Sequence, residues 1–394
     1  MRRVVFVLLC LMVLFIPIEE VITIDSVGSL IKVIGIIAVA AYAVYSAMTW
    51  RAGKLNTILI LSFLFATWAT LSNLWTLNEE FTWERTPTMF LLAAFIYMLY
   101  DIVSDEKELK IITASFCIGA TILAISCIHN YMQGKGISEG SDVMRYSGMG
   151  ENPNRLAVYM AFAVMFWAYS VDAFVTKRRY IPILTVFYVL MAVSVVVMTG
   201  SRNGFVGMIE ALIYLFFFAP SITKRGRATV AILFVFVGLL IFGMLPRTNI
   251  ERLGDTANQI LTGTLTHRTE IWAAAVPVID KHLFLGVGLG SFNTATRFRI
   301  WVAHNSFIAI LTELGAVGLG IFLTILALAV SRVVRRASVK NTCFFVALFI
   351  TWATVASVAD LQLYKITWLM LAFSLILTKR DFMWKSVTTS KAFG

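Results

Sequence analysis

The sequence predicts an all-α polytopic membrane protein, in which residues 1–394 form a single integral membrane domain. Three observations lead to this prediction. Hydrophobic residues make up 59% of the chain, charged residues only 14%, and the mean hydropathy is +0.83, whereas ordinary globular domains carry about 25% charged residues. Apolar segments of membrane-spanning length recur along the chain. Basic clusters alternate with acidic loops between these segments.

About twelve segments are expected to span the membrane, because a spanning helix needs roughly 20 apolar residues, within a range near 17–25. They cover residues 4–18, 29–49, 57–75, 86–103, 111–130, 154–174, 181–199, 204–219, 229–245, 304–330, 342–359 and 364–378. The first has the basic start of a signal peptide but no small-residue cleavage site, so we interpret it as a short first span.

Basic residues mark one side of this arrangement. More than half of the 33 lysines and arginines fall in seven clusters, one in every second connection. The clusters are Arg2 and Arg3; Arg51 and Lys54; Lys107 and Lys110; Lys177, Arg178 and Arg179; Lys224, Arg225 and Arg227; Arg332, Arg335, Arg336 and Lys340; and Lys379, Arg380, Lys385 and Lys391. The positive-inside rule places these clusters and both termini in the cytoplasm. The net charge of +11 therefore reflects membrane topology, and no nucleic-acid partner is expected.

The opposite, outer side carries two longer loops, residues 131–153 and 246–303. In the second loop, between spans nine and ten, "HRTEIWAAAVPVIDKHL" predicts a helix at the membrane surface, with a tryptophan for the interface and a proline that kinks it. The glycines of "GVGLG" follow this helix outside any strand–turn–helix unit, so they predict a turn and not a dinucleotide site. Four cysteines lie in or beside apolar segments without metal or disulfide spacing, which is typical of small core residues.

Four polar side chains are expected at one depth, at the outer membrane–water interface. Arg202 lies in the short connection "TGSRNGF", Arg268 opens the surface helix, His304 opens the tenth span and Asp360 ends the eleventh. Each residue also has an ordinary interpretation. Arginines at helix ends often reach the headgroups, a histidine at a helix start often forms structural hydrogen bonds, and Asp360 could pair with Lys365. Their predicted convergence favours a functional site.

Such a site suits a substrate with a lipid tail and an anionic head. Guanidinium groups bind phosphate oxygens in a bidentate geometry and stay charged. A diphosphate leaving group needs its developing charge neutralised by a metal or by arginines. The outer side has no D-x-D motif and no His/Asp cluster with metal spacing, so we expect a metal-independent site without a cofactor.

Glu313 lies inside the tenth span, about 13 Å beyond His304 at ~1.5 Å per residue along a helix. A carboxylate in a span is costly unless it is paired or faces a cavity. We expect Glu313 to be protonated or to pair with an arginine of another span, and to brace the helix without touching His304.

The chain resembles the O-antigen ligase and O-antigen polymerase family of bacterial envelope glycosyltransferases over roughly residues 140–365. The matching stretches are "RYSGMGENPNRLA", "TGSRNGF", "HRTEIWAAAVPVIDKHLFLGVGLGSF" and "AHNSFIAILTELGAVGLG", followed by an aspartate near the outer end of the next span. Each stretch is degenerate alone, but their order, spacing and shared side of the membrane make the combination fairly specific. The large outer loop is of ordinary to short length, which leaves the acceptor open.

The resemblance implies a GT-C-like fold in the bacterial inner membrane with its active site facing the periplasm. It implies an undecaprenyl-diphosphate-linked glycan as donor and lipid A-core or another glycan as acceptor, with membrane lipids around the protein and inversion at the transferred sugar. By motif, the catalytic residues would be His304, Arg202, Arg268 and Asp360. Substrate-binding residues would be Arg145, Asn154, Arg155 and Asn305. The histidine would act as a base or as a phosphate ligand, and the aspartate would fix its tautomer or position an arginine.

Two other functions stay open from the sequence. A polymerase of the same family would use another lipid-linked repeat unit as acceptor, and it shares fold, donor and the His-Asn motif with the ligases. A transporter for lipid-linked sugars would also explain twelve spans with buried charges. However, transporters often show two related halves with a site at the bilayer midplane. The charges here cluster at the outer interface and no repeat is evident, which favours an enzyme.

Overall fold

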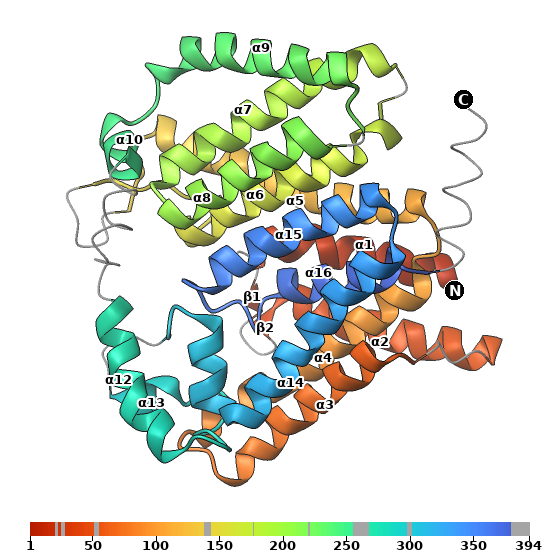
Figure 1. Cartoon of the computed structure of the whole chain (residues 1–394), viewed down its shortest axis with the longest axis vertical. Coiled ribbons are helices and arrows are strands. Elements are labelled where there is room, and N and C mark those ends of the chain that lie inside the picture. The colour runs from red at the N-terminus through yellow and green to blue at the C-terminus, as the bar shows by residue number, and fades with distance from the viewer. Residues whose placement is uncertain are drawn as a thin grey trace.

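The computed structural model describes residues 1–19, 23–24, 28–50, 55–137, 143–175, 177–219, 221–254, 268–297 and 302–379. This part of the chain is almost entirely helical (Figure 1). Its only strands are β1 (Thr23–Ile24) and β2 (Gly28–Ser29), which pair antiparallel. The predicted all-α class is confirmed.

Each predicted span contains a helix in the structure. These helices are α1 (Arg2–Phe15), α2 (Leu30–Thr49), α3 (Thr57–Leu71), α4 (Glu79–Ile102), α5 (Glu106–Met132), α6 (Pro153–Ser170), α7 (Ile181–Thr199), α8 (Arg202–Ile213), α9 (Lys224–Phe242), α14 (Ser306–Arg336), α15 (Val339–Ala356) and α16 (Lys365–Ile376). Among the described residues, seven helices are long and apolar enough to cross a membrane. The chain is thus a polytopic membrane protein, while the count of about twelve spans stays a prediction.

Shorter elements extend or connect these helices. They are the 3-10 turns η1 (Ile16–Ile18), η2 (Ser72–Leu74), η3 (Val171–Ala173) and η4 (Arg178–Tyr180), the π-helical η5 (Tyr214–Phe218), and three helices of the large outer loop, α10 (Arg247–Gly254), α12 (Arg268–Lys281) and α13 (Phe292–Thr296). The surface helix predicted from the sequence corresponds to α12. Residues 138–142, 255–267 and 298–301 of the two predicted outer loops lie outside the described residues.

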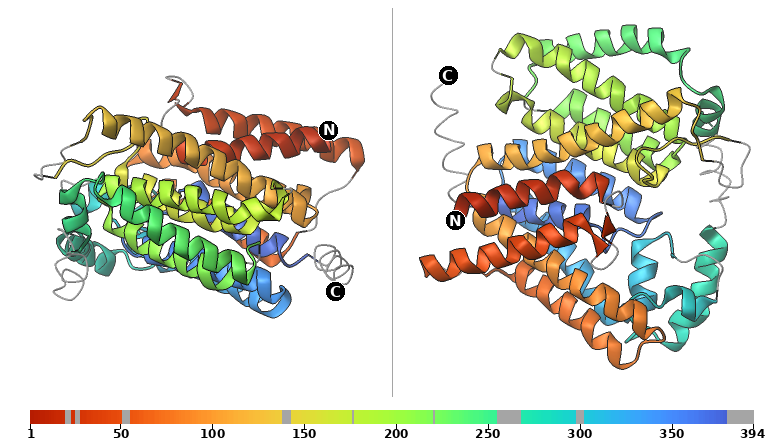
Figure 2. Two further views of the ribbon diagram at one scale, coloured as in Figure 1. Left: turned by 90° about the horizontal axis from the view of Figure 1, so that it is seen from above. Right: turned by 180° about the vertical axis from the view of Figure 1, so that it is seen from behind.

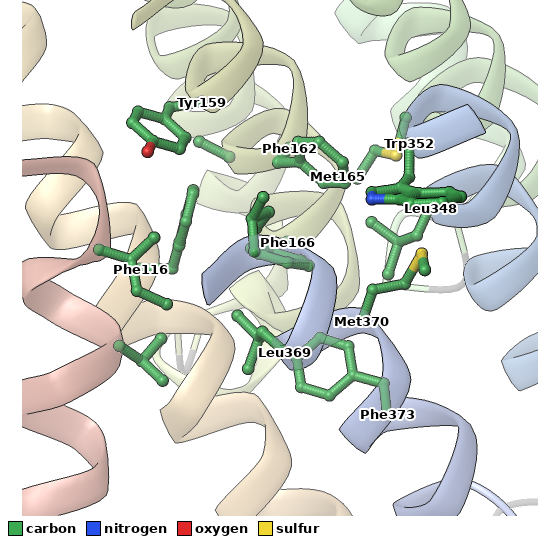
Figure 3. Packing of buried hydrophobic residues seen from close by; sticks show 14 of the residues in the cluster. Phe116, Tyr159, Phe162, Met165, Phe166, Leu348, Trp352, Leu369, Met370 and Phe373 are labelled. Carbon is green, nitrogen blue, oxygen red and sulfur yellow. The ribbon is translucent and has the colours of Figure 1, made fainter. Parts of the chain in front are cut away.

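The centre of the bundle is built around α6 and α16, which are apolar on all sides. A helix that is hydrophobic all round is expected in the interior of a bundle. Aromatic rings interlock there (Figure 3): Phe166 of α6 stands edge-on to Phe116 of α5, with ring centroids 5.0 Å apart, and to Phe373 of α16 at 5.6 Å. The indole of Trp352 donates to Thr367 Oγ1 at 2.8 Å, so the polar atom of this buried ring is satisfied.

The two ends of the bundle differ in charge. At one end, Arg2 pairs with Glu108 at 2.7 Å, and Lys110 and Lys340 both pair with Glu106. These residues come from three predicted cytoplasmic clusters; the predicted basic positions 51, 54, 380, 385 and 391 lie outside the described residues. Helices α10, α12 and α13 lie at the opposite end of the bundle from the N-terminus (Figure 1 and the right-hand view of Figure 2). This separation agrees with the alternation of basic and acidic loops in the sequence.

Helix α14 is interrupted at Gly315, whose φ of 67° and ψ of −171° are not helical. Residues 283–288 of the outer loop insert at this break. Three backbone hydrogen bonds join the loop to the interrupted turn: Ala316 N–H to Leu283 O (2.7 Å), Val287 N–H to Thr312 O (3.0 Å) and Gly288 N–H to Glu313 O (2.8 Å). Interrupted backbone at membrane depth requires such partners, because no water is present to replace them. The expected continuous helix over residues 304–330 is therefore wrong.

Candidate functional site

The connection between α7 and α8 holds Arg202 at the first position of a helix. Gly200, with a φ of 58°, ends α7 in a left-handed conformation that glycine adopts without strain. Ser201 then caps α8, its hydroxyl accepting from Gly204 N–H at 3.3 Å. Nε of Arg202 donates to the carbonyl of Arg252 on α10 at 3.4 Å. Local capping chemistry thus fixes where this half-buried arginine begins its helix.

The side chains of Arg145 and Asn154 stabilise the connection between α7 and α8. Arg145 is only 3% exposed, and its Nε donates to the carbonyl of Thr199, the last residue of α7, at 2.9 Å. Its terminal nitrogen donates to Asn154 Oδ1 at 2.7 Å. Both side chains are therefore engaged with protein groups next to Arg202, although the sequence suggested that they would contact substrate.

Helix α12 places Arg268 beside the start of α14. A small apolar cluster packs the two elements together; it consists of Ile271, Ala275, Phe292, Ala303 and Ala309. The indole of Trp272 donates to the carbonyl of Ala303 at 3.0 Å. Trp272 therefore joins α12 to Ala303, the residue that precedes His304. The sequence had suggested a position at the membrane interface for this tryptophan.

His304 lies in a left-handed turn, with a φ of 51°, and Asp360 holds that turn. The carboxylate accepts from His304 N–H at 3.2 Å and from Asn305 N–H at 3.1 Å. Asn305 caps α14, with its Oδ1 accepting from Phe307 N–H at 2.9 Å and Ile308 N–H at 3.1 Å. Its Nδ2 donates to the carbonyl of Ser357. All polar atoms of the Asn305 side chain thus serve the fold.

Arg268 lies close enough to Arg202, His304 and Asp360 for their charges to interact. Burial lowers the pKa of Arg268, and the nearby charge of Arg202 lowers it further, while Asp360 opposes this. Burial also lowers the pKa of His304 below its ordinary value of 6.5, with a second contribution from Arg268. The imidazole is therefore neutral at pH 7. Burial raises the pKa of Asp360 to about 6, against the backbone donors of Asn305 and His304.

A cavity of about 350 Å³ adjoins the 302–305 turn, with Val302 and Ala303 in its lining. We call it the outer cavity. Its charged lining residues are Glu19, Arg85, Arg155, Glu313, Asp360 and Lys365. They come from the outer ends of α1, α4, α6, α14 and α16 and from the segment before α16. Six charged groups around one small cavity were not predicted from the sequence.

Two of the three cations in the outer cavity have close partners. Lys365 pairs with Glu19, and so not with Asp360 as the sequence allowed. Arg155 pairs with Glu151 at 2.7 Å and donates to the hydroxyl of Tyr364 at 3.2 Å. Arg155, one of the predicted substrate-binding residues, lines the outer cavity.

The third cation, Arg85, lies 4.0 Å from Glu313, which is the limit of an ion pair. Glu313 Oε1 also accepts from Phe292 N–H at 3.4 Å. The expectation that Glu313 pairs with an arginine of another span is therefore confirmed, with Arg85 as the partner. Arg85 itself was missed because the fourth span was expected to begin at residue 86, whereas α4 begins at Glu79. A cap at Asn78, whose Oδ1 accepts from Phe81 N–H, was the available sequence signal.

The fold defines a polytopic helical membrane protein in which Arg202, Arg268 and His304 lie near one another. Residues 187–323, about a third of the chain, match the family model described as O-antigen ligase. This match confirms, over those residues, the resemblance to the O-antigen ligase and O-antigen polymerase family that the sequence predicted. The matched segment contains Arg202, Arg268 and His304, and ends before Asp360. No curated protein matches the chain.

Proposed function

We propose that the chain is an O-antigen ligase-type glycosyltransferase. In this proposal it transfers a glycan en bloc from undecaprenyl diphosphate to a hydroxyl group of lipid A-core. The reaction takes place at the periplasmic face of the bacterial inner membrane, without a metal and with inversion at the transferred sugar. The family match supports the donor and acceptor classes, and the geometry of the cationic site supports the chemistry.

The observation that carries the proposal is a pair of basic side chains with no partner. Within the described residues, neither the guanidinium of Arg268 nor the imidazole of His304 has a hydrogen-bond or ion-pair partner, although both are half-buried. Arg268 also repels Arg202. Two guanidinium groups that repel each other in a half-buried site are unfavourable until an anion joins them. A diphosphate would supply that charge and could be bound bidentately by both guanidinium groups.

An apolar groove beside Arg202 supports a lipid-linked donor. This α7–α9 groove has a volume of about 460 Å³ and is lined chiefly by Leu190, Val193, Val197, Phe234, Leu239 and Leu253. Leu253 is next in sequence to Arg252, whose carbonyl accepts from Arg202. A polyprenyl chain in the groove would therefore place its diphosphate near the arginines.

The neutral state of His304 favours the role of general base. A neutral imidazole has a free nitrogen lone pair that can accept a proton from an acceptor hydroxyl. The hydroxyl oxygen then bonds to the anomeric carbon as the bond from that carbon to the diphosphate breaks. The departing diphosphate takes the electron pair, and Arg202 and Arg268 stabilise its charge.

The remaining predicted site residues receive positioning roles in this proposal. Asp360 and Asn305 hold the backbone around His304, and Arg145 with Asn154 supports the connection that carries Arg202. Fixing the tautomer of His304 or positioning an arginine, the two roles considered for Asp360 from the sequence, stay predictions.

The test is glycan transfer by purified protein in vesicles that contain undecaprenyl-diphosphate-linked glycan and lipid A-core. Arg268→Ala and His304→Ala are expected to lower the transfer rate by at least about a hundredfold, since removing one group that stabilises the transition state typically costs 10²–10³. Arg247→Ala, on the exposed face of α10, is the matched control and should transfer at the parent rate. Parent rates in both site variants would overturn the proposal. A ladder of products on the lipid carrier, in place of one block on lipid A-core, would identify the polymerase alternative.

A further inference from the structure

The outer cavity is separated from the cationic site by a single turn. Val302, Ala303 and Asp360 line the cavity. His304, which follows Ala303 in the sequence, interacts electrostatically with Arg268. Asp360 thus borders the cavity and also holds the backbone of His304. A ligand in the outer cavity would lie against the turn that carries the proposed base.

The hydrogen-bonding groups left open in the cavity are both donors and acceptors. Gln362 lines the cavity and is only 6% exposed; within the described structure its Oε1 is shielded and has no hydrogen-bond partner, so the amide would have to rotate to offer it to a ligand. Such a buried acceptor without a donor is costly. Arg85 contacts Glu313 only at 4.0 Å, so its guanidinium retains donors for another group. A ligand with hydroxyl groups satisfies both, because a hydroxyl donates and accepts.

The charge balance of the cavity argues against an anionic ligand. Three cations, Arg85, Arg155 and Lys365, face three carboxylates, Glu19, Glu313 and Asp360, and the Lys365 and Glu19 charges neutralise each other. The cationic site around Arg268 carries an excess of positive charge; the outer cavity does not. Its volume of about 350 Å³ lies at the small end of ligand pockets, which span about 300–1,000 Å³. Phe292, Leu363 and Ala309 add apolar lining.

From these features we infer that the outer cavity binds the acceptor sugar, a neutral carbohydrate ring whose hydroxyl groups bond to Gln362, Arg85 and Glu313. This inference rests on the proposed function and assigns its second substrate to a separate site. Donor and acceptor then meet at the 302–305 turn, where His304 lies next to both sites. The acceptor hydroxyl passes its proton to a ring nitrogen of His304 and attacks the anomeric carbon, while the diphosphate leaves toward Arg202 and Arg268.

The test measures binding of each substrate alone to purified protein in nanodiscs. Two carbohydrate probes are used, the core oligosaccharide released from the host's lipopolysaccharide and the repeat-unit oligosaccharide freed from its lipid; saturation-transfer NMR reports their binding. Undecaprenyl diphosphate is the donor probe. Gln362→Met removes the buried amide at similar volume, and Arg85→Met is a second variant in case the first folds poorly. Gln133→Met, at the exposed end of α5, is the matched control.

We expect the wild type to bind at least one carbohydrate probe, and both cavity variants to bind it at least about tenfold more weakly with undecaprenyl diphosphate binding unchanged. Arg268→Ala should show the opposite pattern. Unchanged carbohydrate binding in both cavity variants, or no carbohydrate binding by the wild type, overturns the inference. Displacement of the carbohydrate by inorganic diphosphate in the Arg268→Ala protein also overturns it, because the cavity would then prefer an anion. Failure of the donor to bind the wild type would count against the proposed function instead.

Discussion

The carboxylate of Asp360 binds the backbone of His304, with 3.2 Å between Oδ2 and the amide nitrogen. Its other oxygen accepts from Asn305 N–H at 3.1 Å. His304 has a φ of 51°, a conformation that costs an L-residue about 1–2 kcal/mol. Two adjacent N–H groups pointing to one carboxylate offset that cost. The position of the imidazole therefore depends on an aspartate from a different helix connection.

Asp360→Asn is expected to reduce glycan transfer strongly without reducing binding of the lipid diphosphate. The amide can accept at Oδ1, but its NH₂ group would face the second backbone donor. Hydrogen bonds to charged groups contribute about 1.5–3 kcal/mol each, so the loss should slow transfer by roughly tenfold to a hundredfold at 1.36 kcal/mol per decade. Transfer assays at matched membrane levels would measure it. Asp280→Asn, on the exposed side of α12, is the control; equal rates in the two variants would refute this role.

The raised pKa of Asp360 predicts a specific dependence of stability on pH. Its ordinary value is 3.8 and its value in the fold is about 6, so between about pH 4 and pH 6 the folded protein holds a proton that the unfolded chain has lost. Stability therefore falls as pH rises through this window and is level above it. The difference in Tm between wild type and Asp360→Asn, measured from pH 4 to 8 in detergent, should change mainly below pH 6. A difference independent of pH would show that the carboxyl group is not buried as described.

Much of the candidate site could be predicted from the sequence because its residues stand at helix boundaries with local signals. Gly200 and Ser201 end one helix and begin the next within the "TGSRNGF" stretch, so Arg202 could be placed at an outer helix start. Asn305 is a helix cap by type and position. The side of the membrane followed from the basic clusters, and the structure brings Arg202, Arg268 and His304 into one electrostatic field.

What the sequence could not supply were contacts between distant segments. The break in α14 depends on residues 283–288, and neither Gly315 nor Gly286 reveals its partner from local pattern alone. The pairing of Arg85 with Glu313 joins positions far apart in the chain. The family resemblance implied that Arg145 binds substrate, and this stays a prediction. Nothing in its neighbours shows that the carbonyl of Thr199 already accepts its donor.

Gly315→Ala should destabilise the outer part of the protein by more than about 2 kcal/mol. Its left-handed φ of 67° costs an L-residue about 1–2 kcal/mol, and the added Cβ would lie 2.2 Å from the carbonyl oxygen of Phe284. Residues 283–288 would have to move, which would disturb the hydrogen bond from Gly288 N–H to the carbonyl of Glu313. Gly320→Ala is the control in the same helix, where a Cβ meets nothing within 4 Å, and there alanine should be neutral or favourable by up to about 1 kcal/mol. Thermal unfolding in detergent compares the two, and similar Tm values would contradict the described break.

Gly238→Leu should discriminate against donors with long lipid chains. Gly238 lies on α9 in the α7–α9 groove, and a Cβ there would be 3.8 Å from Leu190, which leaves room to begin a side chain. A leucine would then fill part of the groove's volume of about 460 Å³. If the groove holds the polyprenyl chain, the variant should raise KM for an undecaprenyl-linked donor about tenfold and leave KM for a farnesyl-linked donor unchanged. Gly243→Leu, just beyond the end of α9 where a Cβ meets nothing within 4 Å, should change neither value. An equal rise for both donors would contradict selective binding of the long lipid chain in this groove.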